Sequence, residues 1–206
     1  MTRTVLFARH GNTFAPGEKA VWVGRGTDLP LVERGLAQAE EAARAIAATG
    51  LKPDAIYAAS LRRTREFATI IAEKLDLAPP VIDKRLDELD YGAWEGKDND
   101  AIAALGPKAA ADMEAWSTHD AWPETAGWGS VKAEILAGLR AFVAERLDAP
   151  VTLVVSSNGI LRFLPRLILP AEARPSFKMR TGHCGVIAGS RLLGWDLSPD
   201  ELAGIG

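Results

Sequence analysis

Two patterns of hydrophobic and polar positions alternate along this chain. Short continuous apolar runs are typical of buried strands, and apolar residues spaced three or four apart are typical of helices that cover a sheet. The runs that predict strands are residues 4–8, 55–59, 81–84, 151–155, 185–188 and 191–195. The segments that predict helices are residues 33–49, the stretch after Ser60, and residues 98–116, 130–147 and 160–169.

This order of elements predicts a fold class. Strands that alternate with helices indicate an α/β protein with a parallel sheet covered on both faces. A tight turn at Gly189 and Ser190 joins the last two runs, so residues 191–195 are expected to form one antiparallel strand at the edge. We therefore expect a three-layer α/β/α sandwich whose central sheet is mostly parallel.

Composition and charge narrow the possible cellular compartments and binding partners. The 206 residues are 48% hydrophobic and 25% charged, which is ordinary for a globular chain, and we expect one domain over residues 1–206. A formal charge of -3 gives no general attraction to nucleic acid or to an anionic membrane. Cys184 is the single cysteine, and the chain does not start with a basic segment and an apolar signal core. These features favour a cytoplasmic protein without an intrachain disulfide.

The first strand ends in a chemically distinctive sequence. Arg9 and His10 follow the apolar run, and Gly11 lets the backbone turn sharply after it. Ligands of open parallel sheets bind beyond the carboxyl ends of the strands, so a cation and a nucleophile there indicate an anionic substrate. The alternative is that Arg9 binds a carbonyl group and His10 is an ordinary core histidine.

Two further stretches of the sequence contain clusters of charged residues, one basic and one acidic. Ser60 is expected to cap the helix that follows it, and Arg62, Arg63 and Arg65 fall in its first turn. Cations at a helix N-terminus oppose the helix dipole, and a bound anion would explain them. Later, Asp87, Glu88 and Asp90 lie in one loop, and composition alone does not choose among these carboxylates.

Four motifs in order resemble the histidine phosphatase superfamily, the phosphoglycerate mutase-like enzymes. The first is Arg9-His10-Gly11-Asn12-Thr13, which is similar to R-H-G-x-T. The others are Ala59-Ser60-Leu61-Arg62-Arg63, then Leu86-Asp87-Glu88 with Tyr91-Gly92-Ala93-Trp94-Glu95-Gly96, and Val154-Val155-Ser156-Ser157-Asn158-Gly159 with Arg162. The resemblance spans residues 3 to about 195, and it implies the same sandwich fold.

The resemblance also implies a reaction and assigns residues to it. His10 would attack phosphorus to form a phosphohistidine, and Glu88 would protonate the leaving oxygen and then activate water. The residues that would bind substrate are Arg9, Arg63, Thr13, Asn158 and Gly159. No metal or cofactor is required, and the expected partner is a small phosphorylated substrate or a phosphoprotein, with no nucleic acid and no membrane.

Asn158 is the main departure from the family pattern, which has a second histidine there. Asparagine keeps an amide donor but lacks a positive charge, and losing one donor in such a site costs about 100- to 1000-fold in rate. His183 lies just before the strand at 185–188 and is a candidate to compensate, unless it is an ordinary turn residue. The family's loop asparagine is also missing, and Arg25 is either a substitute cation or an ordinary exposed arginine of the loop.

Three functions stay open. The first is a phosphatase for a small phosphoester or a phosphoprotein, and the second is a phosphoglycerate mutase. The mutase function lacks support, because mutases of the family bind a second phosphate with basic residues in the segment 97–128. This segment, expected as a lid-like insertion, carries only Lys97 and Lys108 as basic residues. The third is a phospho-ligand-binding protein whose catalysis is weakened by Asn158. His119 in the insertion receives no role.

Overall fold

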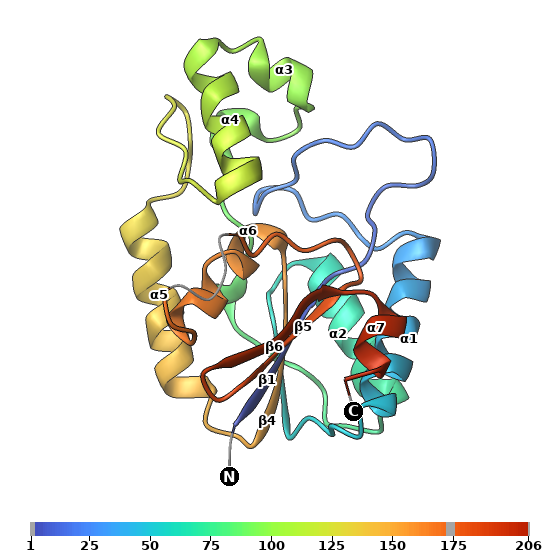
Figure 1. The fold of residues 1–206 in the computed structure, drawn as a ribbon. Helices are drawn as coiled ribbons and strands as arrows, with labels where there is room; N and C mark the ends of the chain where they lie inside the picture. The colour runs from blue at the N-terminus through green and yellow to red at the C-terminus, as the bar shows by residue number, and fades with distance from the viewer. Residues whose placement is uncertain (1–2, 172–175, 206) are drawn as a thin grey trace.

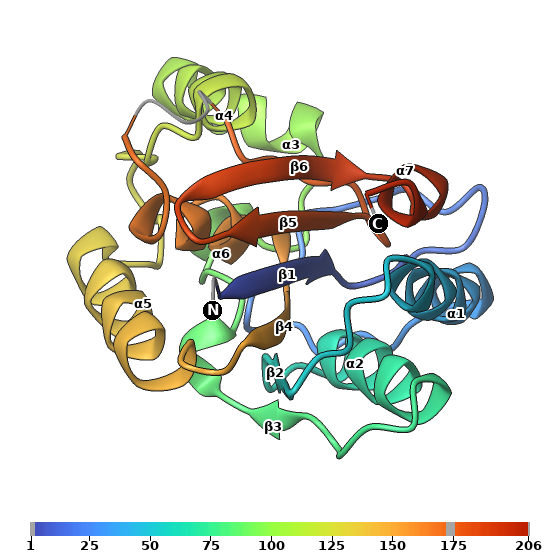
Figure 2. The same cartoon turned by 60° about the horizontal axis from the view of Figure 1, so that its bottom comes forward.

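A mixed sheet forms the centre of the protein. The computed structural model describes residues 3–171 and 176–205. Within these residues the sheet has six strands in the order β3-β2-β4-β1-β5-β6 (Figure 2). The strands are β1 (Thr4–Arg9), β2 (Ala55–Ala58), β3 (Val81–Ile82), β4 (Val151–Ser156), β5 (Cys184–Ala188) and β6 (Arg191–Leu197).

Strand directions confirm the predicted fold class and refine it. β1, β2, β3 and β4 run parallel to one another, whereas β5 is antiparallel to β1 and β6 is antiparallel to β5. β6 is the edge strand, as expected. β5, one position in from the edge, is the strand that runs opposite to the parallel strands. The tight turn at Gly189 (φ 59°) then sends β6 back along β5.

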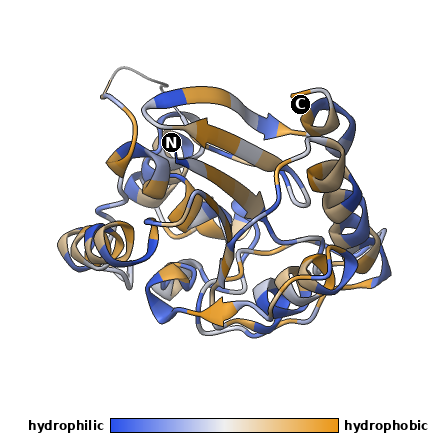
Figure 3. Ribbon diagram, turned by 90° about the horizontal axis from the view of Figure 1, so that it is seen from below, coloured by the Kyte–Doolittle hydropathy of each residue, from blue (hydrophilic) through white to orange (hydrophobic). Residues whose placement is uncertain are grey.

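Alternation along the central strands separates two hydrophobic cores. Leu6, Ile56 and Leu153 pack into one core, whereas Phe7 and Val154 pack into the other. Successive strand residues point to opposite faces, so a strand buried on both sides must be apolar throughout. The central strands are accordingly mostly hydrophobic in Figure 3.

Helices cover both faces and make the three layers (Figures 1 and 2). One face packs against α1 (Glu33–Ala48), α2 (Arg62–Lys74) and α7 (Pro199–Ala203), and the other packs against α5 (Lys132–Arg146) and α6 (Asn158–Leu161). Short 3-10 turns are η1 (Lys84–Leu86), η2 (Gly92–Trp94) and η3 (Leu164–Leu167). Among the described residues, no helix is long and apolar enough to cross a membrane.

The segment predicted as one helix over residues 98–116 is two helices. α3 (Asn99–Ala103) and α4 (Pro107–His119) are separated at Gly106, whose φ of 133° is outside the range that a helix allows. Both helices rise beyond the carboxyl ends of the parallel strands, at the same end as the long loop between β1 and α1 (Figure 1). We keep the interpretation of one domain with an insertion at this end.

Two other predictions need correction. Ser60 does not cap α2, because its hydroxyl and backbone N–H both donate to the Asp87 carboxylate, and the cap residue is Leu61. Instead, Asp28 in the β1–α1 loop accepts from the N–H of Arg62. The predicted helix over residues 160–169 is the short α6 followed by η3, because Pro165 lacks the N–H that would continue α-helical hydrogen bonding.

Candidate active site

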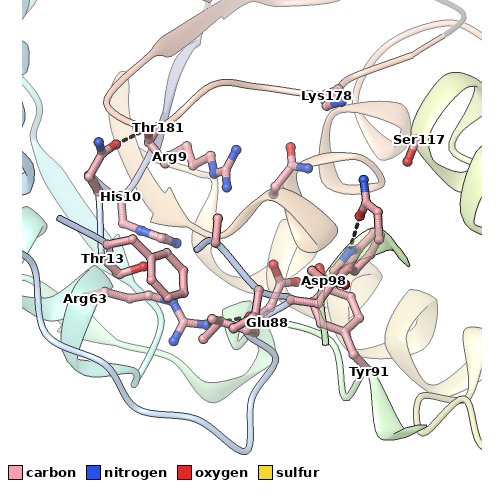
Figure 4. Close-up of a pocket in the computed structure, with 18 of the residues that line it drawn as sticks. Arg9, His10, Thr13, Arg63, Glu88, Tyr91, Asp98, Ser117, Lys178 and Thr181 are labelled. Atoms are coloured by element: carbon pink, nitrogen blue, oxygen red, sulfur yellow. Dashed lines mark hydrogen bonds between the residues drawn. The ribbon is translucent and has the colours of Figure 1, made fainter. Parts of the chain in front are cut away.

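The parallel strands bring the expected site residues to one edge of the sheet. Arg9 at the end of β1 is in register with Ser156 at the end of β4, so His10 and Asn158 emerge side by side. Arg63 enters from the start of α2, which follows the neighbouring strand β2. These side chains line a cavity of about 660 Å³ whose wall also includes residues of the β1–α1 loop and α3 (Figure 4).

His10 is held as a neutral ring with one nitrogen free. The ring is 6% exposed, and its Nδ1 lies 2.8 Å from the carbonyl oxygen of Gly11. A carbonyl oxygen only accepts, so Nδ1 carries the proton and the lone pair of neutral imidazole is on Nε2. Burial, and then the charges of Arg9 and Arg63, hold the pKa of His10 well below its usual value. The ring therefore carries an unprotonated Nε2 at neutral pH.

Arg9 and Arg63 are fixed by backbone carbonyl groups. Nη1 of Arg9 donates to the carbonyl of Met179 at 2.6 Å, whereas its buried Nε has no hydrogen-bond partner among the described residues. Arg63 donates to the carbonyls of Thr27 (2.8 Å) and Gly24 (3.2 Å) in the β1–α1 loop. Burial lowers the pKa of both guanidinium groups, although Glu88 opposes this effect. Two desolvated cations thus flank the His10 ring.

Glu88 is distinguished from its two neighbouring carboxylates by its contacts. Asp87 binds Ser60, and Asp90 accepts from the N–H of Gly92, which stabilises the loop. Glu88 is 3% exposed and lines the cavity. Its Oε1 accepts from the N–H of Leu89 (2.8 Å) and its Oε2 accepts from the N–H of Gly159 (3.1 Å).

Tyr91 and Gly159 complete the surroundings of Glu88. The pKa of Tyr91 is raised well above its usual value by burial and by the negative charge of Glu88, with which it shares a hydrogen bond. Its hydroxyl therefore stays a donor. A Cβ on Gly159 would lie 2.2 Å from Oε1 of Glu88, so only glycine lets the start of α6 approach this carboxylate.

Asn158 has a defined orientation. Its Oδ1 accepts from the backbone N–H of Met179 at 2.9 Å, and an amide nitrogen could not accept that bond. The NH₂ group is therefore on the other side of the side-chain amide, and the residue lines the cavity. Asn158 therefore offers a neutral donor at the cavity.

Two residues with candidate roles lie outside the cavity lining. The His183 ring contacts Asp196, with Nδ1 2.9 Å from the backbone carbonyl oxygen, so the expected contact with a phosphoryl group must be corrected. Arg25 is exposed, and its Nε donates to the carbonyl of Glu88 at 3.2 Å, so it does not supply the missing loop contact. Thr13 does line the cavity, and Gly159 reaches the site through its N–H.

Sequence reasoning missed the segment that precedes β5. β5 is antiparallel to β1, so its start lies beside the end of β1, and the backbone of Met179 binds both Arg9 and Asn158. Lys178 and Thr181 of this segment line the cavity (Figure 4). No local pattern marks these residues, because only the reversed direction of β5 brings them there.

The β1–α1 loop and α3 meet over the mouth of the cavity. Trp22 donates from its indole nitrogen to Oδ1 of Asn99 at 2.9 Å, and its backbone N–H donates to the carbonyl of Lys97 at 2.9 Å. Lys19 forms an ion pair with Asp98. Within residues 3–171 and 176–205, no group of three or more His, Cys, Asp and Glu side chains is placed to hold a metal ion.

The curated relatives of this chain include phosphoglycerate mutases. The chain is 35% identical over 192 residues to the 2,3-bisphosphoglycerate-dependent phosphoglycerate mutase of Methylobacterium sp. strain 4-46, covering 88% of this chain and 89% of the relative. It is 31% identical to the mutase of Clavibacter michiganensis over 52% of this chain, but the match covers only 43% of that relative's length. The chain thus spans less than half of some relatives that it matches.

Solved structures support the fold, and a family model gives the assignment. Mycobacterial glucosyl-3-phosphoglycerate phosphatase, in its complex with VO3, superimposes with a TM-score of 0.78 at 25% identity, covering 95% of this chain and 100% of that one. The α-ribazole phosphatase of Shigella flexneri shares the fold, with a TM-score of 0.68 at 23% identity over 92% and 95% of the two chains. The model of the histidine phosphatase superfamily (branch 1) matches residues 5–190, and the chain belongs to that superfamily.

Proposed function

We propose that this protein hydrolyses phosphate monoesters through a phosphohistidine intermediate on His10. The observation that supports this most directly is the state of the His10 ring. Its proton is committed to the Gly11 carbonyl, its pKa is lowered, and two buried arginines flank it. Such a ring is a nucleophile placed where an anion binds, which is what phosphoryl transfer requires.

The proposed reaction has two steps. Nε2 of His10 attacks phosphorus, the bond to the ester oxygen breaks, and Glu88 gives its proton to the leaving alkoxide. Water then attacks the phosphohistidine, the Glu88 carboxylate accepts the proton, and inorganic phosphate leaves. Arg9, Arg63 and the Asn158 amide bind the peripheral oxygens throughout, where donors are most effective because the site is desolvated.

The cavity favours a small molecule over a phosphoprotein as substrate. Its volume of about 660 Å³ is in the range of small-molecule sites, roughly 300–1,000 Å³. The contacts of Trp22 with α3 restrict the opening above it. The guanidinium groups act as the cations of the reaction, so we expect activity to survive treatment with EDTA; activity restored only by added Mg²⁺ or Zn²⁺ would contradict this.

The experiment is a screen of phosphorylated metabolites for release of inorganic phosphate. The parent protein should release phosphate from a subset of the panel. The matched control is His10→Gln, which keeps a planar polar side chain but offers no nucleophile, and it should release none. A parent protein that binds phosphoesters without release would instead support the phospho-ligand-binding alternative.

A phosphoglycerate mutase is the second candidate, because the Methylobacterium relative carries that name and is matched over most of its length. The two candidates differ in their dependence on a bisphosphate primer. Phosphoglycerate isomerisation that requires catalytic amounts of a bisphosphoglycerate would establish the mutase. Release of phosphate without any primer would support the phosphatase.

A further inference from the structure

Arg162 is a buried arginine of the cavity wall that the proposed reaction does not use. It is 2% exposed and lines the same cavity as His10. It follows Asn158 by four residues, and its N–H donates to the Asn158 carbonyl at 3.2 Å. Residues four apart in a helix share one face, about 6 Å apart along the axis. Arg162 is therefore one helical turn away from the amide that we assign to the phosphoryl group.

The position of the Arg162 guanidinium is fixed from one side. Nη1 donates to the carbonyl of Trp116 at 2.5 Å and binds the buried carboxylate of Asp120. The guanidinium also lies over the Trp116 ring, 4.6 Å from its centroid. Asp120 is held in turn by the N–H of Phe177 at 2.9 Å. These contacts fix the orientation of the Arg162 guanidinium in the folded protein.

These contacts leave the Nε edge of the guanidinium unused. The Nε of Arg162 is buried and makes no hydrogen bond to any residue that the structure describes. A buried donor without an acceptor is unfavourable, so such groups in native proteins call for an explanation such as a ligand.

We propose that Arg162 binds a carboxylate on the alcohol portion of the substrate, and that Asp120 and Trp116 are its positioning residues. This rests on the proposed function, since it places the ester oxygen between His10 and Arg162. The Nε side of a guanidinium presents parallel N–H groups that match the two oxygens of a carboxylate. The protein then selects phosphoesters that carry a second negative charge a few bonds from phosphorus.

The test uses pairs of ligands that differ in this charge alone. They are the phosphate esters of 3-hydroxypropanoic acid and 5-hydroxypentanoic acid, each compared with its carboxamide. Binding is measured by calorimetry in the His10→Gln background, where no turnover interferes, and kcat/KM is measured with His10 intact. With Arg162 present, at least one acid should bind more tightly than its amide. Arg162→Met should lower this acid-to-amide ratio about 10- to 100-fold.

Two further variants separate ligand binding from structure. Arg162→Met combined with Asp120→Asn avoids leaving a buried carboxylate that has lost one of its two arginine partners, and it should lose the preference in the same way. Arg166→Met is the matched control, since Arg166 also binds Asp120 but does not line the cavity, and it should keep the preference. An equal loss of binding for acid and amide, or no preference at the outset, would overturn the proposal. A retained preference without any turnover would refute only the hydrolytic function.

Discussion

The side-chain oxygen of Asn158 accepts a hydrogen bond from the backbone N–H of Met179 at 2.9 Å. This contact joins the end of β4 to the segment before β5, and it determines which end of the amide is available to a ligand. The site consequently offers a neutral N–H donor at the end of β4. Four groups from different parts of the chain, Arg9, His10, Arg63 and Asn158, can then surround one phosphoryl group.

Asn158→Asp tests the orientation of this amide. The carboxylate can still accept from Met179, but it replaces the donor with a negative charge that repels phosphate. We expect kcat/KM to fall at least about 100- to 1000-fold, while Asn158→Ala loses the donor only and costs less. Steady-state kinetics of the parent and both variants on one phosphoester measures these losses. Equal activity of the Asp variant and the parent would show that the amide does not face the substrate.

Gly159→Ala tests the close approach of α6 to the proposed acid. The added methyl group would lie 2.2 Å from Oε1 of Glu88, so the carboxylate must move. A displaced catalytic group costs about 100-fold in kcat, whereas the fold should remain because Gly159 is at the start of a short helix. Circular dichroism and kinetics should separate the two effects. A fully active Ala variant would place the proton donor elsewhere.

Glu88→Gln should have an effect that depends on the leaving group. Alkyl phosphates release a strongly basic oxygen that needs a proton, whereas aryl phosphates do not. We expect the Gln variant to slow alkyl esters about 100-fold more than aryl esters. Asp90→Asn is the control, because Asp90 contacts Gly92 and does not line the cavity. Equal slowing of both ester classes would remove Glu88 from the role of acid.

The lowered pKa of His10 has a consequence for stability. In the unfolded chain His10 titrates near its usual pKa of about 6.5, whereas in the folded protein it stays neutral to lower pH. Below about pH 6.5 the unfolded state therefore binds more protons, and folding stability falls as pH falls. The loss is at most about 1.4 kcal/mol per pH unit.

His10→Gln should remove this pH dependence. Denaturant unfolding of the parent and the variant at several pH values between neutral and mildly acidic gives the difference in their free energies of unfolding. That difference should be constant above about pH 6.5 and should shift in favour of the variant below it. A difference that does not change with pH would mean that the folded protein binds a proton on His10 as readily as the unfolded chain.

Local patterns predicted the strands and the end of β1 well, because continuous apolar runs leave little choice for a central parallel strand. Phe7 and Val154 each lie in a strand predicted to within a residue. α7 was missed, although Ser198 and Glu201 form a capping box, with Pro199 at the start of the helix, that could have been recognised. The break at Gly106 was missed because helical spacing continues on both sides of it.

From local sequence alone, the candidate site was predicted only at the end of β1, where reactive side chains directly follow the strand. Arg9 and His10 stood out from their sequence, whereas Glu88 could be chosen over Asp87 only through the family resemblance. Met179 and Lys178 depend on the direction of β5, which sequence spacing does not give. The expectation for His183 failed for the same reason, because proximity to a strand start does not fix the side on which a ring lies.

The central claim is that the phosphoryl group is transferred to His10. The most direct measurement is to quench the protein during turnover of a phosphoester that the screen identifies and to locate the phosphorylated residue by mass spectrometry. We predict one adduct, on His10, that is lost in acid, is stable in base and is absent from His10→Gln. An acid-stable adduct on a serine, or an adduct that persists in His10→Gln, would contradict this account.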